Sequence, residues 1–369
     1  YLTSKKAHYL YQAVCSGHLS VNGDFTKKFQ HFFEERYGFG KSLLTTSCTD
    51  ALEMAALLCD IKPGDEVIMP AYTFVSTANA FVLRGAKIDF ADSRSDHPGI
   101  DEEPSEALIN EKTRVIVPVH YAGVSCDMDK IMALAHKYGL WVVEDAAQAI
   151  DSFYTDKNGI KKALGSIGHL AAFSFHETKN IMSGEGGMLV INEERLQARA
   201  EVIWEKGTNR SAFFRGEVDK YGWIDVGSSF LPSEISAAFL WAQLENLDAI
   251  QQQRTMHWTV YRDGLKQWAD QSGVLLPLVP EYATNNAHMF YLVCSSLQQR
   301  TDLLNLLNKN GVHAVFHYLS LHSSPFYREK HDGRLLPESD RYSDCLVRLP
   351  MSFELDAGAV IDKLTNSLH

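Results

Sequence analysis

AAFSFHETKNIMSGEGGMLVI, residues 171–191, contains two short apolar runs on either side of a glycine-rich turn that carries one lysine. The runs 171–176 and 187–191 are bounded by turn residues, a pattern typical of buried strands. Lys179 lies in the connection, where glycines permit a tight turn and a close backbone approach. An ordinary lysine titrates near about 10.4, so chemistry would require it to be desolvated or held as an imine. The alternative is that Lys179 is an ordinary solvated lysine in a loop, and the other motifs of the chain must decide between the two interpretations.

Outward from this stretch, toward the N-terminus, short aliphatic runs alternate with amphipathic segments of helical length. The pattern predicts strands at 43–46, 66–70, 87–91, 115–120 and 140–144, and helices at 49–58, 75–83 and 128–138. Two further helices are expected before them, at 2–14 and 25–37. Alternating strands and helices imply βαβ units, so we predict an α/β fold with a mostly parallel sheet covered on both faces.

Toward the C-terminus the pattern changes. A helix at 193–206 is followed by KGTNRSAFFRGEVDKYGWIDVGSS (206–229), which holds too many aromatic residues for a disordered linker. Helices are then expected at 233–247, 251–268, 301–308 and 357–368, with strands at 288–293 and 314–319. We therefore predict a large α/β domain over residues 1–247 and a small α+β domain over residues 248–369.

The overall composition excludes several classes of protein. The chain has 369 residues and a formal net charge of −11, which argues against non-specific binding to nucleic acid or to an anionic membrane. No apolar run approaches the length of a membrane span, so no membrane insertion is expected. The six cysteines have no CxxC spacing, which favours a reducing compartment and hence the cytoplasm.

Three histidines raise the question of a metal site. His313, His317 and His322 give an HxxxH spacing followed by a third histidine. No cysteine or second acidic cluster completes a coordination shell around them. We therefore predict no metal, and substrate contact is the better functional interpretation.

The motif VVEDAAQ (142–148) places a carboxylate at a strand end. Asp145 ends a predicted buried strand, where open parallel sheets form their ligand crevices. Capping of the next helix is an equally good interpretation of this residue. Gln148 would project near the same crevice, with a surface amide as the alternative.

Two other motifs suggest contacts to a flat, phosphorylated ligand. In TTSCTDALEMAA (45–56), a strand end runs into a helix start at Ser47 and Thr49, which is a natural anion site, although ordinary capping would look the same. Ser174 could add a hydroxyl to that site. In PAYTFVSTANA (70–80), Phe74 could stack on a heterocycle or lie in the core.

Taken together, a turn lysine, a buried acid, an aromatic ring and an anion-binding helix start are what a pyridoxal 5′-phosphate (PLP) enzyme needs. No GxGxxG follows a strand and no GxxxxGK[ST] is present, so a dinucleotide-binding fold or a nucleotide triphosphatase is poorly supported.

With these motifs in this order, the chain resembles the DegT/StrS-type nucleotide-sugar aminotransferases, fold type I PLP enzymes, over essentially its whole length. FSFHETKN…GEGG resembles the lysine signature of the family, VEDAAQ its aspartate signature and PAYTFVST its ring-stacking segment. The resemblance implies a set of cofactor contacts: Lys179 for the imine, Asp145 for the pyridine nitrogen, Gln148 for the phenolic oxygen, Phe74 for stacking, and Cys48, Thr49 and Ser174 for the phosphate.

Two positions depart from the pattern of the family. Many relatives have glycine where Cys48 stands and asparagine where Ser229 stands. In the family, the residue at the second position reaches the phosphate of the neighbouring subunit. The resemblance therefore implies a homodimer with shared active sites, in which Ser229 would make that contact.

Within the family, CTDALEMAALL, EKGTNR, FFRG, VDKY and AHMFY resemble the members that use glutamate to aminate the C4 ketone of dTDP-4-keto-6-deoxyglucose. Such enzymes make a dTDP-4-amino-4,6-dideoxy sugar for surface glycans such as lipopolysaccharide or the common antigen. For the substrate contacts we predict Arg210, Arg215 and Lys220 at the diphosphate, and His176, His317 and Tyr318 near the sugar. A surface ion pair is an equally good interpretation of each arginine.

Three alternatives remain. A 3-keto-sugar aminotransferase would share every cofactor residue. A PLP-dependent sugar dehydratase of the same fold has histidine in place of the lysine, and Lys179 argues against it. A non-catalytic binding protein on this scaffold would show no absorbance change with glutamate.

Overall fold

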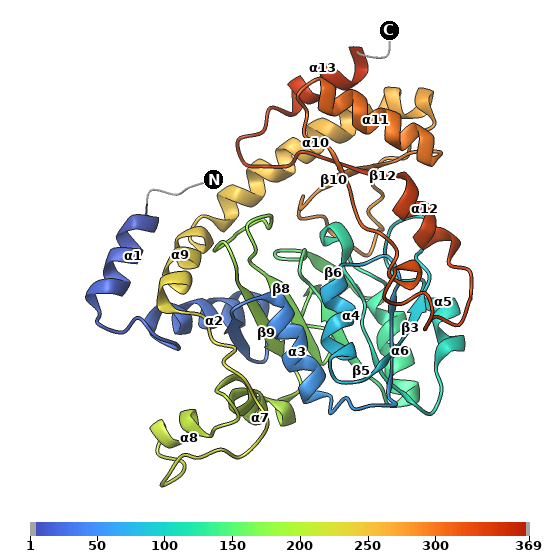
Figure 1. The fold of residues 1–369 in the computed structure, drawn as a ribbon. Coiled ribbons are helices and arrows are strands. Elements are labelled where there is room, and N and C mark those ends of the chain that lie inside the picture. The colour runs from blue at the N-terminus through green and yellow to red at the C-terminus, as the bar shows by residue number, and fades with distance from the viewer. Residues whose placement is uncertain (1–4, 367–369) are drawn as a thin grey trace.

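The centre of the molecule is a seven-stranded sheet, seen in the computed structural model, which describes residues 5–366 (Figure 1). The strand order is β1-β9-β8-β5-β4-β2-β3. Only β9 is antiparallel to its neighbours β1 and β8, while the other pairs are parallel. The predicted α/β fold with a mostly parallel sheet is therefore confirmed. The strands are β1 (Ser42–Thr45), β2 (Glu66–Pro70), β3 (Lys87–Ala91), β4 (Thr113–Ile116), β5 (Trp141–Asp145), β8 (Leu170–Ser174) and β9 (Gly187–Ile191).

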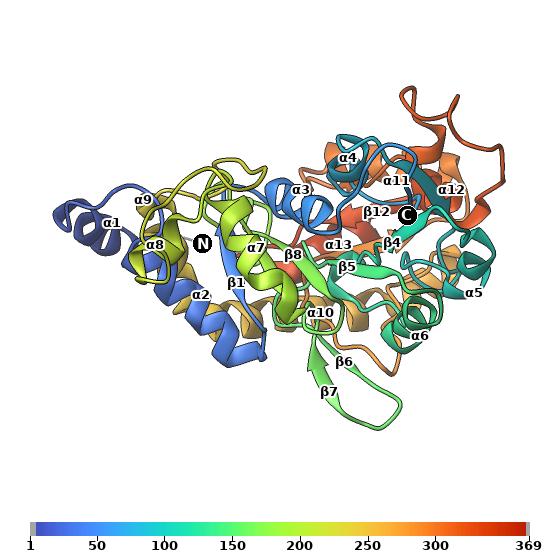
Figure 2. The ribbon, with the colours of Figure 1, turned by 90° about the horizontal axis from the view of Figure 1, so that it is seen from below.

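Helices cover both faces of this sheet (Figure 2). The alternating side chains of each strand separate into two cores: Leu189 and Ile191 of β9 belong to one, Met188 and Val190 to the other. Burial on both faces explains why the strands are almost continuously apolar. The helices that pack in the core with Met188 and Val190 are α1 (Lys6–Cys15), α2 (Asp24–Tyr37), α6 (Met128–Tyr138), α9 (Glu234–Leu244) and the start of α10 (Leu247–Ser272). Those in the core with Leu189 and Ile191 are α3 (Cys48–Leu58), α4 (Val75–Val82) and α7 (Glu194–Trp204).

One edge of the sheet collects the chain segments expected to carry chemistry. The parallel strands β5 and β8 end at this edge in Asp145 and Ser174. Because β9 runs the opposite way, it begins there, with Gly187 opposite both Ser174 and Thr45. The turn that holds Lys179 connects β8 to β9 at the same edge. The topology therefore brings the lysine, the acid and the start of α3 together.

A smaller antiparallel sheet, of order β10-β12-β11, forms with helices at the top of the molecule (Figure 1). The long helix α10 (Leu247–Ser272) leads into it from α9. Its elements are β10 (Phe290–Val293), α11 (Leu297–Lys309), β11 (Val315–Phe316), β12 (Leu346–Leu349) and α13 (Ala357–Asn366). Between β11 and β12, residues 321–336 return to the core of the large sheet, where the hydroxyl of Tyr327 donates to the carbonyl of Ile88 in β3. The predicted boundary at residue 247 stays a prediction.

Several element boundaries differ from those expected. The strand at 115–120 ends at Ile116, and the strand at 314–319 is only two residues long. Residues 2–4 and 367–368 of the two predicted terminal helices lie outside the described residues; the first helix, α1, is seen as Lys6–Cys15. The elements not predicted were the β6 (Phe153–Thr155) and β7 (Lys161–Ala163) hairpin, α5 (Glu102–Ser105), α8 (Arg210–Phe214), α12 (Pro337–Cys345), β12, and the short 3₁₀ turns at Glu106–Leu108, Tyr121–Gly123 and Leu321–Ser323.

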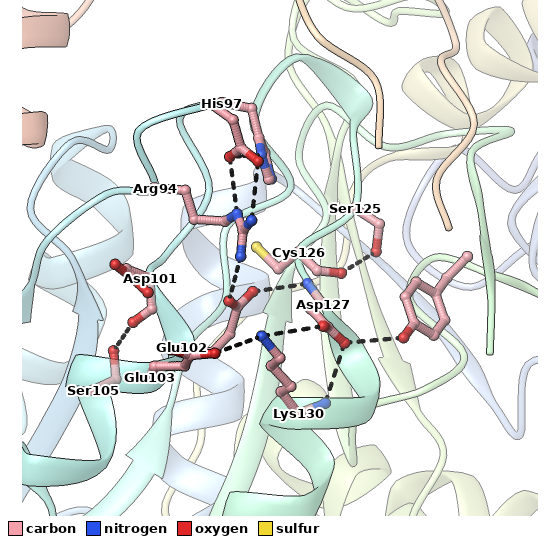
Figure 3. A network of polar contacts seen from close by, with 12 residues as sticks. Arg94, His97, Asp101, Glu102, Glu103, Ser105, Ser125, Cys126, Asp127 and Lys130 are labelled. Atoms are coloured by element: carbon pink, nitrogen blue, oxygen red, sulfur yellow. Dashed lines mark hydrogen bonds and ion pairs between the residues drawn. The ribbon is translucent and has the colours of Figure 1, made fainter. Parts of the chain in front are cut away.

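A polar network ties the loop after β3 to the start of α6 (Figure 3). Arg94 pairs with Asp96 at 2.9 Å and with the almost fully buried Glu102 at 3.1 Å. Glu102 also accepts a 2.9 Å hydrogen bond from the amide of Asp127, which caps α6. From α12, the hydroxyl of Tyr342 donates to the carbonyl of Arg94 at 3.0 Å. This network fixes the C-terminal segment against the large sheet.

No helix within residues 5–366 is both long enough and apolar enough to cross a membrane.

Candidate active site

A cavity of about 360 Å³ opens at the carboxyl edge of the large sheet. Its wall is built from the starts of α3 and α4, the end of β5 and the turn between β8 and β9. The small sheet closes it with residues from β12 and from the segment after β11. The lining includes Lys179, Asp145, Gln148, Phe74, Cys48, Thr49, Ser174, His176, His317 and Tyr318.

Lys179 is held by the backbone of its turn. Its amide donates to the carbonyl of His176 at 2.9 Å, and the amide of Glu177 donates to Gly184, whose φ of 80° suits glycine. Burial lowers the pKa of the Lys179 amine; the nearby Cys48 and Asp145 act in the opposite direction, and the charge of Arg348 lowers it further. Lys179 lines the cavity. Its lowered pKa favours the neutral, nucleophilic form of the amine.

Asp145 is buried and fixed by two hydrogen bonds. The hydroxyl of Thr77 donates to Oδ2 at 2.7 Å, and the amide of Ala147 donates to Oδ1 at 3.1 Å. The hydroxyl of Thr73 lies 3.0 Å from that of Thr77. Because the Thr77 proton is committed to Asp145, Thr73 must be the donor in this pair. Each oxygen of Asp145 keeps further capacity to accept a hydrogen bond from a ligand.

Gln148 and Phe74 line the same cavity. The side-chain oxygen of Gln148 accepts from the amide of Ala122 at 2.6 Å, and its nitrogen donates to the hydroxyl of Tyr318 at 3.2 Å. The ring of Phe74 is 53% exposed, with its centroid 5.8 Å from that of Tyr318. Phe74 is therefore not the core phenylalanine considered as an alternative. Its ring is free to contact a flat ligand.

The start of α3 forms an anion site beside Lys179. Ser47 caps the helix by accepting from the amide of Asp50 at 3.0 Å. The amides of Cys48 and Thr49, in the first turn, have no partner within the helix. Gly187 lets β9 approach this turn closely, because a Cβ there would come within 2.3 Å of the Cys48 nitrogen. The hydroxyl of Ser174 lines the same cavity.

The structure does not bring every predicted residue to this cavity. Arg210, Arg215, Lys220 and Ser229 are absent from its lining in this chain. Arg210 pairs with Glu205 at 3.2 Å, and Arg215 with Glu201 at 2.9 Å. The two arginines line a second cavity, of about 760 Å³, beside α7 and α8. In this single chain they are therefore surface ion pairs, and their assignment to substrate stays a prediction.

The histidines considered for a metal site do not converge. His317 accepts or donates a 3.0 Å hydrogen bond with Tyr121, His322 lies 3.6 Å from Asp340, and His313 is exposed. Across residues 5–366 no group of three histidine, cysteine, aspartate or glutamate side chains is placed to hold a metal ion.

Four functional residues escaped the sequence analysis. Thr77 lies inside a motif that was singled out for Phe74, so its spacing held a usable signal. The others, His120, His288 and Arg348, also line the cavity. His288 lies in AHMFY, which was quoted only for its resemblance to the family, and no role was predicted for any of the three. His120 bonds at 2.8 Å to the fully buried Glu144, whose carboxylate also accepts from the amides of Gly165, Ile167 and Gly168. These hydrogen bonds fix Glu144, the residue of β5 next to Asp145, and hold His120 in place at the wall of the cavity.

These residues fit the cofactor that the sequence motifs imply. A turn lysine with a lowered pKa, a buried carboxylate with spare acceptor capacity, a half-exposed ring and free helix amides surround one space. Because Gly187 has no Cβ, β9 packs against the backbone of Ser47 and Cys48 without displacing it. The free amides at the start of α3 can therefore bind a phosphate. Lys179, Asp145, Gln148, Phe74, Cys48, Thr49 and Ser174 would hold PLP there.

Comparison with known proteins gives a consistent picture. The model of the DegT/DnrJ/EryC1/StrS aminotransferase family matches residues 1–367. The spore coat polysaccharide biosynthesis protein SpsC of Bacillus subtilis is 33% identical over 322 residues, which cover 85% of this chain and 80% of that protein. The uncharacterized protein MJ1066 of Methanocaldococcus jannaschii is 31% identical over 348 residues, which cover 92% and 88%. The crystal structure of DesV from S. venezuelae has a TM-score of 0.88 and 28% identity, covering 99% of this chain and 95% of that one.

Proposed function

The chain belongs to the DegT/DnrJ/EryC1/StrS family of PLP-dependent sugar aminotransferases, and from this premise we propose that it moves the amino group of glutamate to the C4 ketone of dTDP-4-keto-6-deoxyglucose. The product would be a dTDP-4-amino-4,6-dideoxy sugar for a surface glycan such as lipopolysaccharide or the common antigen. The enzyme would then be a dTDP-4-amino-4,6-dideoxygalactose transaminase. One relative, SpsC, is itself named for polysaccharide biosynthesis.

The observation that carries the proposal is one juxtaposition. Lys179, with its pKa lowered by burial, and Asp145, fixed by Thr77, line one cavity beside the open start of α3. An aminotransferase needs an amine that can give up and take back a proton, and a carboxylate that holds positive charge on a heterocycle. Both lie at the carboxyl edge of a parallel sheet, where ligands bind in such folds.

The residues divide the work of the reaction. PLP, when bound, supplies the electron sink. Asp145 would accept a hydrogen bond from the ring nitrogen and so favour its protonated form. Lys179 would act as the base that removes the α-proton of glutamate in the first half of the reaction, and as the acid that delivers a proton to C4 of the sugar in the second. Phe74 and Tyr318 line the cavity with their ring centroids 5.8 Å apart, where Phe74 would stack on the cofactor ring.

The test is to incubate the holoenzyme with glutamate and dTDP-4-keto-6-deoxyglucose and to identify the amino sugar. We expect a yellow protein that loses its visible absorbance with glutamate and regains it with the keto sugar. Lys179→Ala should abolish both changes. Turnover by that variant would contradict the assignment. A 3-keto sugar nucleotide as the better substrate would instead favour the 3-keto-sugar aminotransferase.

We also propose a homodimer with shared sites that works in the cytoplasm. Large apolar side chains are exposed together in the segment that holds Phe214, Trp223 and Ile224, at 68%, 84% and 59%. Ser229 is exposed nearby, available to a neighbouring subunit. All six cysteines are free thiols, which suits a reducing compartment.

A further inference from the structure

Arg348 lies in the wall of the active-site cavity, on the central strand of the small sheet. In β12 it stands opposite Tyr291 of β10 and Val315 of β11. Tyr291 packs edge-on against Tyr121 at a centroid distance of 5.9 Å, so this face of the small sheet is turned toward the large one. A central strand, bonded on both sides, holds the Cα of Arg348 rigidly. The side chain is partly buried and lines the cavity.

The guanidinium of Arg348 has no protein partner among residues 5–366. Its Nε is buried and makes no hydrogen bond. The cavity is lined by only two carboxylates, those of Asp145 and Glu185. Asp145 is engaged by Thr77 and Ala147, and Glu185 lies 3.7 Å from His176. An arginine with five donors and a permanent charge is costly to bury without an anion, so the missing partner is expected to be a ligand.

Among residues 5–366, no other side chain that lines the cavity competes with Arg348 for an anion, apart from the reactive Lys179. Burial lowers the pKa of His317 to about 2, and the charges of Arg348 and Lys179 add to the effect. Burial likewise lowers the pKa of His288 well below its usual value. Both rings are therefore neutral at physiological pH. Arg348 and Lys179 are the only lysine or arginine side chains in the lining, and Lys179 is required for chemistry.

The position relative to Lys179 decides which anion fits. Arg348 is close enough for its charge to act on Lys179. In an amino acid, the α-carboxylate is attached to the same carbon as the reacting nitrogen. In a 4-keto-sugar nucleotide, the diphosphate is attached at C1, across the pyranose ring from C4. The phosphate of the cofactor has its own candidate partners at the start of α3.

We infer that Arg348 binds the α-carboxylate of the amino-acid donor through a bidentate contact, an inference that rests on the proposed aminotransferase function. The residue would act as the specificity determinant for an α-amino acid over a simple amine. Its planar fork matches a carboxylate, and the small sheet, of which it is part, holds its backbone in place.

The experiment compares Arg348→Met and Arg348→Lys holoenzymes with the wild type. Glutamate is titrated while the visible absorbance is followed, and 4-aminobutyrate serves as a donor that has an amine but no α-carboxylate. Binding of glutarate, which cannot react, and of dTDP is measured by calorimetry. Arg84→Met is the matched control, because Arg84 is exposed and lies outside the cavity.

We expect Arg348→Met to weaken glutamate binding about 100-fold, in line with the loss of a charge-assisted pair, and to weaken glutarate binding as well. Arg348→Lys should recover part of the loss. The preference for glutamate over 4-aminobutyrate should disappear, while dTDP affinity and the cofactor spectrum stay unchanged.

Two results would overturn the inference: glutamate affinity within about threefold of wild type in Arg348→Met, or a loss confined to dTDP. If the wild-type protein itself does not respond to glutamate, the proposed function fails instead, so the two failures are distinguishable.

Discussion

Thr77 is the side chain on which the orientation of Asp145 depends most directly. Its hydroxyl is the only side-chain donor to that carboxylate within the described chain, at 2.7 Å, and Thr73 supports it from the other side at 3.0 Å. The threonine pair lies on the first turn of α4 and the residues before it, so one helix start fixes the acid on a neighbouring strand.

Replacing Thr77 by valine keeps the shape and removes the hydroxyl. We expect kcat to fall about tenfold or more, because a hydrogen bond to a charged group contributes about 1.5–3 kcal/mol. Thr77→Ser, which keeps the donor, should retain most of the activity. The measurement is steady-state kinetics together with the cofactor absorbance spectrum. Equal activity of the valine and serine variants would show that the hydroxyl has no such role.

Other residues of the site were accessible to sequence reasoning because each stands in a local pattern. Asp145 is the last residue of the apolar strand β5, Lys179 lies in the turn after β8, and Phe74 lies in the turn after β2. All three residues line the same cavity. Their individual roles toward the cofactor stay predictions.

At the level of elements, β9 can pack closely against the start of α3 because Gly187 has no side chain. Gly187 pairs with Thr45 of β1 and with Ser174 of β8, and it faces the backbone of Ser47 and Cys48. The amides that would hold a phosphate keep their place because no Cβ separates strand and helix.

Gly187→Ala should therefore displace the start of α3. A Cβ would meet backbone atoms at 2.3 Å, which cannot be relieved by a side-chain rotation. We expect a loss of about 1–3 kcal/mol in the free energy of unfolding, as for overpacked cores, and weaker cofactor binding. Denaturant unfolding and a cofactor titration measure the two effects.

Gly358→Ala is the control for this variant, because Gly358 is exposed on α13 and a Cβ there would make only an ordinary contact, 3.4 Å from Oδ1 of Asp356. It should behave like the wild type. If Gly187→Ala bound the cofactor with unchanged affinity, the start of α3 would not be the phosphate site.

For the whole molecule, the main exposed apolar feature that the proposal uses is the surface around α8. Phe214, Trp223 and Ile224 are exposed in and just after α8, and α8 lies on the side of the molecule opposite α12 (Figures 1 and 2). Clusters of exposed large apolar side chains are typical of interfaces. A second copy of the chain is the occupant that the proposed shared site requires.

We expect the wild-type protein to sediment as a dimer and Trp223→Glu to dissociate at concentrations where the wild type does not. Burying a charge at the centre of an interface without a partner weakens association by several kcal/mol, so the shift should be about 100-fold or more in dissociation constant. Analytical ultracentrifugation gives both values. Leu335→Glu, at an 89% exposed site in the loop before α12, should leave the dimer intact. A wild-type monomer would contradict the shared-site proposal.

The sequence by itself determined the strands of the large sheet, the lysine turn and the acid at the end of β5. These follow from patterns within a few residues: apolar runs buried on two faces, and glycines where the backbone must turn or approach closely. Short elements without such a pattern, such as α12 and β12, were missed, since tertiary contacts rather than local propensity define them.

The tertiary structure alone decided which distant residues complete the cavity. Arg348 comes from a strand almost 170 residues after Lys179, and only the return of the chain through the small sheet brings its charge to the amine. The structure likewise places Arg210 and Arg215 in ion pairs beside α7, outside the lining of the cavity in this chain, and their assignment to the substrate stays a prediction. The spacing of residues along the sequence determines which side chains share a face of one helix or strand. Which charged side chains come together in the partly buried cavity depends on how the two sheets pack, and burial there strengthens their interaction.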